Sequence, residues 1–163
     1  MKRPKKSLSQ NFIKDKNICN KILKNITINN KNVLEIGPGY GFLSDIILEK
    51  KPKKLYLIEK DDDLSKFLSE KYKNNNIIEI INTDILNYNL SKLNNLKKIS
   101  IISNLPYNIS TRIILKFFYN SSSIEEMVFM IQKEVAEKFD YKLKNINKYK
   151  FLNKIYSDYK ICF

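Results

Sequence analysis

The sequence predicts an α/β protein built on a doubly wound, mostly parallel sheet. Short, almost wholly apolar runs alternate with stretches in which apolar residues recur at helical spacing. Strands of that composition are buried on both sides, as happens when helices cover both faces of a parallel sheet. The three glycines of the 163-residue chain also fall within five positions, directly after the first apolar run. A glycine turn between a strand and a helix is typical of sheets that bind a nucleotide-like ligand there.

The predicted elements follow one another in a regular order. A helix is expected over 15–26, because its apolar residues recur at helical spacing. The first strand, Val33–Ile36, then enters the glycine turn, and the helix Phe42–Glu49 runs on until Pro52 stops it. Further helices are expected around Phe67 and Phe117 and over 132–143. Four more strands are expected at Leu55–Glu59, Ile77–Ile81, Ile99–Ser103 and Met127–Ile131. A sixth strand could open at Tyr159–Phe163.

Composition excludes several classes of protein. The chain has no histidine, which rules out a Ser-His-Asp triad and a histidine-ligated metal site. Its two cysteines, Cys19 and Cys162, have no metal-ligand spacing and are too few for a disulfide scaffold. No apolar run reaches membrane-spanning length and no signal region follows the basic N-terminus, so a cytoplasmic protein is expected. The net charge of +13 favours a nucleic acid as partner, although an AT-rich genome would also raise the lysine count.

Polar residues stand at the ends of four successive predicted strands: Gly37, Glu59, Asp84 and Asn104. The carboxyl ends of parallel strands meet at one edge of a sheet, and ligands bind outside that edge. Glu59 follows Gly37 by 22 residues, which suits an acid that accepts hydrogen bonds from ribose hydroxyls. The alternative is that the Glu59 carboxylate caps the following helix. Asp84 either accepts from an adenine amino group or caps a turn.

The run Asn104–Tyr107 is the most specific of these features. Pro106 has a fixed backbone and lacks an N–H, so nearby carbonyls can face outward as acceptors. The Asn104 amide adds an acceptor, and Tyr107 offers a flat face on which a base stacks. Two acceptors beside an aromatic ring fit a planar base that carries an exocyclic amine, such as adenine or cytosine. Acceptors that hold its hydrogens would free the nitrogen lone pair, so no histidine base is needed. A plain proline turn is the alternative.

These motifs together resemble those of S-adenosylmethionine-dependent N6-adenine methyltransferases. Three longer segments resemble one family in particular, the KsgA family of rRNA adenine dimethyltransferases. These segments are Lys6–Phe12, Asn104–Thr111 and Met130–Ala136. The resemblance implies a Rossmann-like methyltransferase catalytic domain over 1–163, in which residues 1–12 form a basic arm and a donor-covering motif. It implies methyl transfer from S-adenosylmethionine to N6 of two adjacent adenines near the 3′ end of small-subunit rRNA, within the immature small ribosomal subunit.

The resemblance also implies a role for individual residues. The donor-binding positions would be Asn11, Ile13, Gly37, Gly39, Glu59, Asp84 and Asn104. The catalytic motif would comprise Asn104, Leu105, Pro106 and Tyr107, with Tyr107 stacking on the flipped target base and Phe129 helping to clamp it. The basic arm Lys2–Lys6 and the lysines over 133–160 would contact rRNA phosphates. No metal is implied, and a monomer is expected.

The chain departs from the family pattern in three places. Ser9 stands where the family usually has glycine, and Tyr149–Asn153 stands where it usually has Tyr-Gly-Arg-Leu-Ser. The family pattern also continues beyond Phe163 with an antiparallel strand and a small helical domain. We therefore expect the sheet to lack its last strand, the sixth strand to have no partner, the helical domain to be absent, and the fifth strand to present an unpaired apolar edge.

Other functions remain open from the sequence. One is methylation of large-subunit rRNA, as in the Erm enzymes; Leu105, where those enzymes tend to carry isoleucine, favours the small subunit. A second is a non-catalytic RNA-binding or ribosome assembly factor. A third is an NAD-binding oxidoreductase on the same kind of sheet, which would leave Asn104–Tyr107 unexplained.

Overall fold

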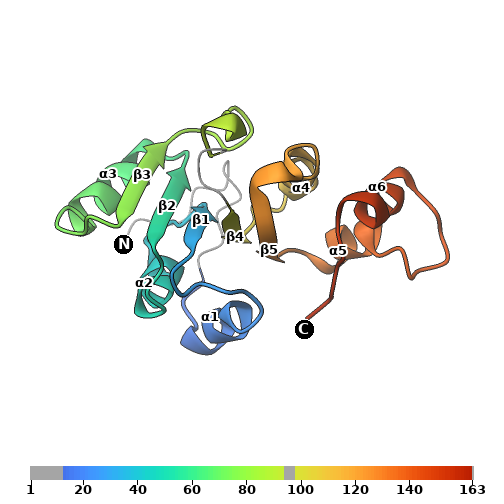
Figure 1. Ribbon diagram of the computed structural model, residues 1–163, viewed down its shortest axis with the longest axis horizontal. Helices are drawn as coiled ribbons and strands as arrows, with labels where there is room; N and C mark the ends of the chain where they lie inside the picture. The colour runs from blue at the N-terminus through green and yellow to red at the C-terminus, as the bar shows by residue number, and fades with distance from the viewer. Residues whose placement is uncertain (1–12, 94–97, 163) are drawn as a thin grey trace.

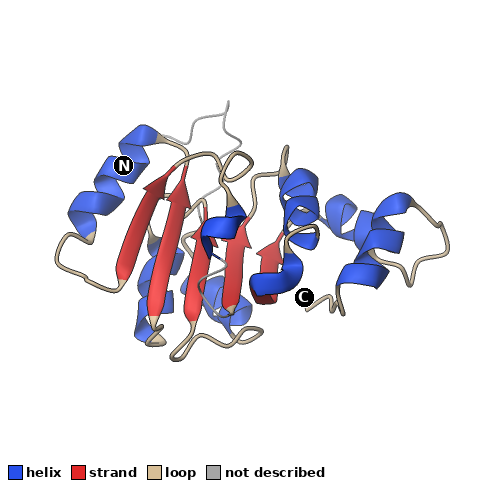
Figure 2. Ribbon diagram, turned by 45° about the horizontal axis from the view of Figure 1, so that its top comes forward, coloured by secondary structure: helices blue, strands red, loops and turns tan. Residues whose placement is uncertain are grey.

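A computed structural model describes residues 13–93 and 98–162 and places five strands in one parallel sheet (Figures 1 and 2). The strands lie in the order β3-β2-β1-β4-β5, and every neighbouring pair is parallel. The order reverses between β1 and β4, which confirms the doubly wound α/β topology and places its switch point there. Their bounds are β1 Asn32–Ile36, β2 Lys54–Glu59, β3 Ile78–Asn82, β4 Ile99–Asn104 and β5 Ile124–Met130.

Helices cover both faces of this sheet. α1 (Lys16–Leu23), α2 (Phe42–Glu49) and α3 (Asp62–Lys71) pack on one face with Val33. α4 (Ser110–Phe118) packs on the other with Leu34, and α5 (Lys133–Phe139) and α6 (Lys148–Tyr156) extend that layer beyond β5 (Figure 1). Successive β1 side chains thus enter opposite cores, as strand geometry requires. Two short 3₁₀ turns complete the described elements, η2 (Leu90–Leu93) and η3 (Ser121–Ser123).

The helices begin at residues suited to that place. Asp15, Asp61 and Asn147 precede α1, α3 and α6, and each side chain accepts hydrogen bonds from main-chain N–H groups in the first turn. α2 differs, because it starts after Gly41, whose φ is 75° and which offers no side chain for capping. A Cβ at position 41 would lie 2.5 Å from the Tyr72 hydroxyl oxygen, so glycine is required there by space as well as by conformation.

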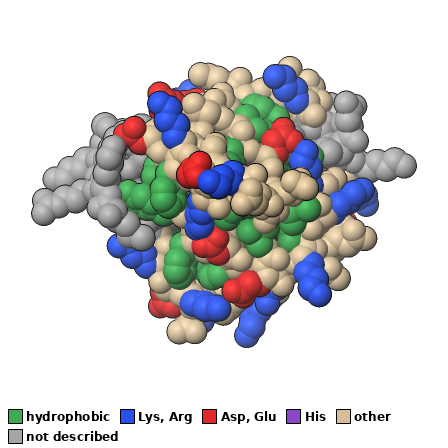
Figure 3. Space-filling view, turned by 90° about the vertical axis from the view of Figure 1, so that its left-hand side faces the viewer, with side chains coloured by type: hydrophobic (Ala, Val, Ile, Leu, Met, Phe, Trp, Pro, Cys, Tyr) green, Lys and Arg blue, Asp and Glu red, His purple; other side chains and the backbone are tan. Residues whose placement is uncertain are grey.

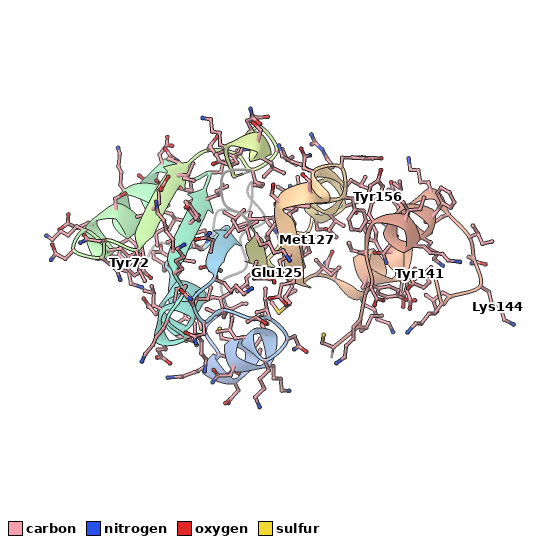
Figure 4. All side chains as sticks on the ribbon, in the orientation of Figure 1. Tyr72, Glu125, Met127, Tyr141, Lys144 and Tyr156 are labelled. Carbon is pink, nitrogen blue, oxygen red and sulfur yellow. The ribbon has the colours of Figure 1, made fainter. Side chains whose placement is uncertain are left out.

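The C-terminal third differs from the expectation in two respects. The helix predicted over 132–143 ends at Phe139, because Asp140 turns the chain and accepts a hydrogen bond from the Lys142 N–H. A further helix, α6, follows and was not predicted. Its Tyr156, labelled in Figure 4, stacks on Phe118 of α4 with ring centroids 6.0 Å apart.

The sixth strand predicted at Tyr159–Phe163 is wrong for its described residues. Residues 157–162 form no strand, and Phe163 lies outside the described part of the chain. Tyr159 instead packs its ring against Tyr141, with centroids 4.6 Å apart, and its hydroxyl bonds the Asp140 carboxylate. Apolar alternation alone therefore does not make a strand, because strand formation depends on tertiary context. β5 remains an edge of the described sheet, as expected, and residues 157–162 do not pair with it.

Candidate functional site

The carboxyl edge of the sheet brings the predicted residues together. Ile36 at the end of β1 is in register with Ile58 of β2 and Ser103 of β4. The next residue along each strand is Gly37, Glu59 or Asn104, so these three lie at the same level. The Gly37 N–H continues the ladder to the Ile58 carbonyl at 2.9 Å, and the Ser103 hydroxyl donates to the Ile36 carbonyl at 2.6 Å.

The glycine turn has one open side. Gly37, Gly39 and Gly41 all have positive φ, at 64°, 61° and 75°. Gly37 is exposed, and a Cβ built on it would meet no atom within 4 Å. Gly41, in contrast, is enclosed by Tyr72, Leu68 and Lys71. The turn therefore rests on α3 at its far end and leaves its first glycine facing open space above the sheet.

Glu59 joins this turn to β2. The side chain is 6% exposed, its Oε2 accepts from the Gly39 N–H at 3.2 Å, and its Oε1 accepts from the Asp61 N–H at 2.9 Å. Burial raises the pKa of Glu59, opposed by these two main-chain donors. The alternative in which Glu59 caps α3 is wrong, because Asp61 is the residue that caps that helix. Each carboxylate oxygen has a second lone pair for a further donor.

Asp84 lies two residues beyond β3 and already has two partners. Its Oδ1 accepts from the Leu86 N–H at 2.9 Å, so the turn-capping role is present. Its Oδ2 forms an ion pair with Lys60 Nζ at 2.9 Å. Burial raises the pKa of Asp84 and the hydrogen bond from Lys60 lowers it, and the net direction is downward. Lys60 was not singled out from the sequence, although it directly follows Glu59 at a strand end.

The Asn104–Tyr107 run crosses from β4 to α4. Asn104 is the last residue of β4, and its side-chain oxygen Oδ1 is buried. Leu105 is 1% exposed, and its N–H donates to the Met130 carbonyl at 3.1 Å, which ties the run to the end of β5. The Pro106 carbonyl accepts from the Ile109 N–H. Tyr107 follows in the same run and is 38% exposed.

The remaining predicted positions are held by other contacts or lie outside the described residues. Ile13 packs against the hydrophobic core on the α1 and α2 side. Phe129 is in register with Ser103 near the carboxyl end of β5, and its ring packs against Phe117 with centroids 6.2 Å apart. Asn11 and the basic arm Lys2–Lys6 lie outside the described residues. Lys150 does not fit the predicted phosphate-binding set, since it is 5% exposed and its Nζ donates to the Leu143 carbonyl.

Sequence reasoning missed the residues beneath the turn. Glu35 is 2% exposed and accepts a hydrogen bond of 2.6 Å from the Ser44 hydroxyl. The Tyr72 hydroxyl lies 3.1 Å from the Gly41 carbonyl and 2.7 Å from Asp45 Oδ1 (Tyr72 is labelled in Figure 4). Glu35 could have been identified from the sequence, because it is a charged residue within an otherwise apolar predicted strand.

Charge on the face near α3 is mixed. In Figure 3, Lys and Arg side chains are interspersed with Asp and Glu. Ion pairs explain this pattern, among them Lys54 with Glu79 and Lys71 with Asp45. In the described part of the chain, no three His, Cys, Asp or Glu side chains are grouped to hold a metal ion. Within the same residues, none of the helices has the length and apolar character needed to cross a bilayer.

Comparison with known proteins agrees with this architecture. The family described as "Ribosomal RNA adenine dimethylase" matches residues 1–155. A protein of Pelagibacter ubique named "Ribosomal RNA small subunit methyltransferase A" is 48% identical over 148 residues, which cover 89% of this chain and 55% of that protein. A protein of the same name from Mesomycoplasma hyopneumoniae (strain 232) is 43% identical over 135 residues, covering 83% and 50%. The chain thus spans about half the length of the curated relatives it matches.

Solved structures show the same fold. A dimethyladenosine transferase from Plasmodium falciparum superposes with a TM-score of 0.74 at 26% identity, over 89% of this chain and 52% of that one. The 23S rRNA methyltransferase ErmE superposes with a TM-score of 0.67 at 28% identity, over 78% and 50%. The strand order, the glycine turn and a sequence match over nearly the whole chain lead to one conclusion: the chain belongs to the ribosomal RNA adenine dimethylase family.

Proposed function

We propose that this chain is the catalytic domain of an S-adenosylmethionine-dependent rRNA adenine N6-dimethyltransferase. Its target would be two adjacent adenines near the 3′ end of small-subunit rRNA in an immature small ribosomal subunit. The observation that carries the proposal is the placement of Asn104–Tyr107 beside the glycine turn, at one edge of one sheet. An oxidoreductase built on the same kind of sheet would leave the run Asn104–Tyr107 without a role.

The residues at the edge fit the donor. Gly37 leaves open space where a ligand can approach the main chain, and the buried Glu59 carboxylate lies next to it with lone pairs suited to ribose hydroxyls. Asp84 would accept from the donor's adenine amine, with Asn11 and Ile13 closing over it. When bound, S-adenosylmethionine supplies an electrophilic methyl group on a sulfonium ion.

The chain's own groups would orient the target base. Asn104 and a neighbouring main-chain carbonyl would accept the hydrogens of the adenine N6 amine and direct its lone pair. The exposed Tyr107 ring would stack on the base after it leaves its helix. Leu105 and Pro106 would hold the carbonyls in place, since Leu105 is bonded to the end of β5. Positioning would therefore supply most of the catalysis.

The basic character of the chain supports an RNA partner. Residues 141–156 contain five lysines and no acidic residue, and four of them are exposed: Lys142, Lys144, Lys148 and Lys154. Figure 4 labels Lys144 on the loop between α5 and α6. Contacts from such lysines to phosphates would be independent of sequence and weakened by salt. We also propose that the protein acts in the cytoplasm, as a monomer and without a metal.

Methyl transfer can be tested directly. Undermethylated small subunits would be incubated with the folded protein and labelled S-adenosylmethionine, and the labelled nucleotides would be mapped. We expect label in two adjacent adenines of small-subunit rRNA and its loss in Asn104→Ala. Asn74→Ala is the matched control, because Asn74 is exposed in the loop that precedes β3, at the opposite edge of the sheet.

The same experiment separates the other candidate functions. Label in large-subunit rRNA would favour an Erm-like activity, which the likeness to ErmE makes worth testing. No label from folded protein would contradict the enzyme. A non-catalytic assembly factor would be supported if Asn104→Ala retained its biological role while no methyl transfer was detected.

A further inference from the structure

Glu35 is a buried carboxyl group that the proposed methyl transfer does not use. It is the fourth residue of β1, between Leu34 and Ile36, and is 2% exposed. Because side chains alternate along a strand, Glu35 shares a face with Val33, under α1 and α2. A buried carboxyl in an otherwise apolar strand costs stability unless it is bonded, so it calls for a structural or functional reason.

The hydrogen bond of Glu35 joins the two ends of the glycine turn. The Ser44 hydroxyl, itself 0% exposed, donates to Glu35 Oε2 at 2.6 Å. Ser44 lies in the first turn of α2, and Glu35 lies two residues before Gly37. The bond therefore closes residues 36–43 into a loop from below, whereas the contact of Glu59 with Gly39 holds the loop from the side.

The carboxyl is suited to this place in its neutral form. Burial raises the pKa of Glu35 to about 8, opposed by the Ser44 hydrogen bond, so the group is protonated at neutral pH. A neutral acid avoids adding another negative charge beneath the turn, next to carboxylates. The titratable groups that face it are Cys19 from α1, Asp45 from α2, Glu59 from β2 and Lys71 and Tyr72 from α3 and its end.

We propose that Glu35 is a positioning residue for the methyl donor: through Ser44, it holds the glycine turn in the conformation that presents Gly37 to the donor. The identity of the donor rests on the proposed function, and the support of the turn rests on the hydrogen bonds alone. Glu35 would not touch the donor, because it is 2% exposed and shares the face of Val33 under α1 and α2.

Hydrogen exchange in the ligand-free protein tests the support of the turn. In Ser44→Ala, which removes one oxygen atom, we expect the amides of Gly37, Gly39 and Gly41 to exchange about tenfold faster than in the wild type. Ser100→Ala is the matched control. Ser100 is also 0% exposed, and its hydroxyl lies 3.2 Å from the Thr27 carbonyl near the amino end of β4. Equal exchange at the three glycines in both variants would overturn the inference.

Donor binding tests the consequence. Calorimetry with S-adenosylmethionine should give a Kd about tenfold weaker for Ser44→Ala and at least as weak for Glu35→Ala, with Ser100→Ala unchanged. Glu35→Gln should bind within about threefold of the wild type, because its neutral amide oxygen still accepts from Ser44.

Two outcomes would contradict the positioning role: wild-type affinity in Ser44→Ala, or equal losses in Glu35→Gln and Glu35→Ala. The proposed function fails separately. If folded wild-type protein bound no donor, that proposal would be wrong, while the exchange comparison would still decide whether Glu35 supports the turn.

Discussion

Glu59 accepts a hydrogen bond from the Gly39 N–H at 3.2 Å, so the acid at the end of β2 and the turn after β1 form one unit. If the proposed function holds, loss of the acid would remove a ligand contact as well as loosen the turn. For Glu59→Ala we expect donor affinity to fall about tenfold to a hundredfold, since hydrogen bonds to charged groups contribute ~1.5–3 kcal/mol. Calorimetry would measure this. Glu49→Ala, at an exposed acid on α2, is the control, and an equal loss there would argue against a specific role.

Stability should depend on pH through Glu35. Its pKa is about 8 in the folded protein against an ordinary value of 4.5, so between these values the folded state holds a proton that the unfolded state has released. The free energy of unfolding contributed by Glu35 is therefore fully present below pH 4.5 and falls as pH rises to 8, by at most ~1.4 kcal/mol per pH unit. Glu35→Gln should remove this fall. Urea unfolding at pH 5, 6.5 and 8 would measure the free energy of unfolding of the wild type and of Glu35→Gln. Parallel pH profiles for the two proteins would show that the interpretation is wrong.

The two ends of the glycine turn should respond differently to alanine. Gly41→Ala should lower the free energy of unfolding by more than the ~1–2 kcal/mol of conformational strain, because its Cβ would lie 2.5 Å from the Tyr72 hydroxyl. Gly37→Ala should cost only that strain but should weaken donor binding more, because its Cβ would enter the open space above the turn. Denaturant unfolding and calorimetry on both variants would check this, and the reverse order would contradict it.

Substitution of Tyr107 should weaken recognition of the target base and leave binding of the donor unchanged. We expect Tyr107→Ala to lower kcat/KM for the RNA about tenfold to a hundredfold, because stacking on an aromatic ring contributes ~1–3 kcal/mol per base. Tyr107→Phe keeps the ring and should stay close to the wild type. The donor Kd should not change in either variant. Tyr119→Ala, at another exposed tyrosine, is the control.

The Lys60–Asp84 ion pair should contribute little to stability. Lys60 is 58% exposed, and such pairs give at most ~1 kcal/mol. Lys60→Ala should therefore unfold almost as the wild type does, whereas Asp84→Ala should cost more because it also removes the acceptor for the Leu86 N–H. Equal losses of unfolding free energy in the two variants would show that the ion pair, and not the turn cap, is what matters.

The sequence predicted the strands and the sheet edge because their signals are local. Val33–Ile36, the glycines after it and Glu59 can each be recognised from a few neighbouring residues. The support beneath the turn could not be predicted in this way, since Tyr72 contacts Gly41 across 31 positions of sequence. The sixth strand failed for a related reason: the alternation at Tyr159–Phe163 is local, whereas Tyr159 is held by Tyr141 and Asp140 and not by a strand ladder.

Gly41 and Tyr72 therefore constrain each other's evolution. A Cβ at position 41 would lie 2.5 Å from the Tyr72 hydroxyl oxygen, and glycine leaves room for that hydroxyl to lie 3.1 Å from the main-chain carbonyl of residue 41. In a genetic selection that begins from Gly41→Ala, Tyr72→Phe should arise as a partial suppressor. It removes the oxygen that lies 2.5 Å from the new methyl group, and the positive φ remains as the residual defect.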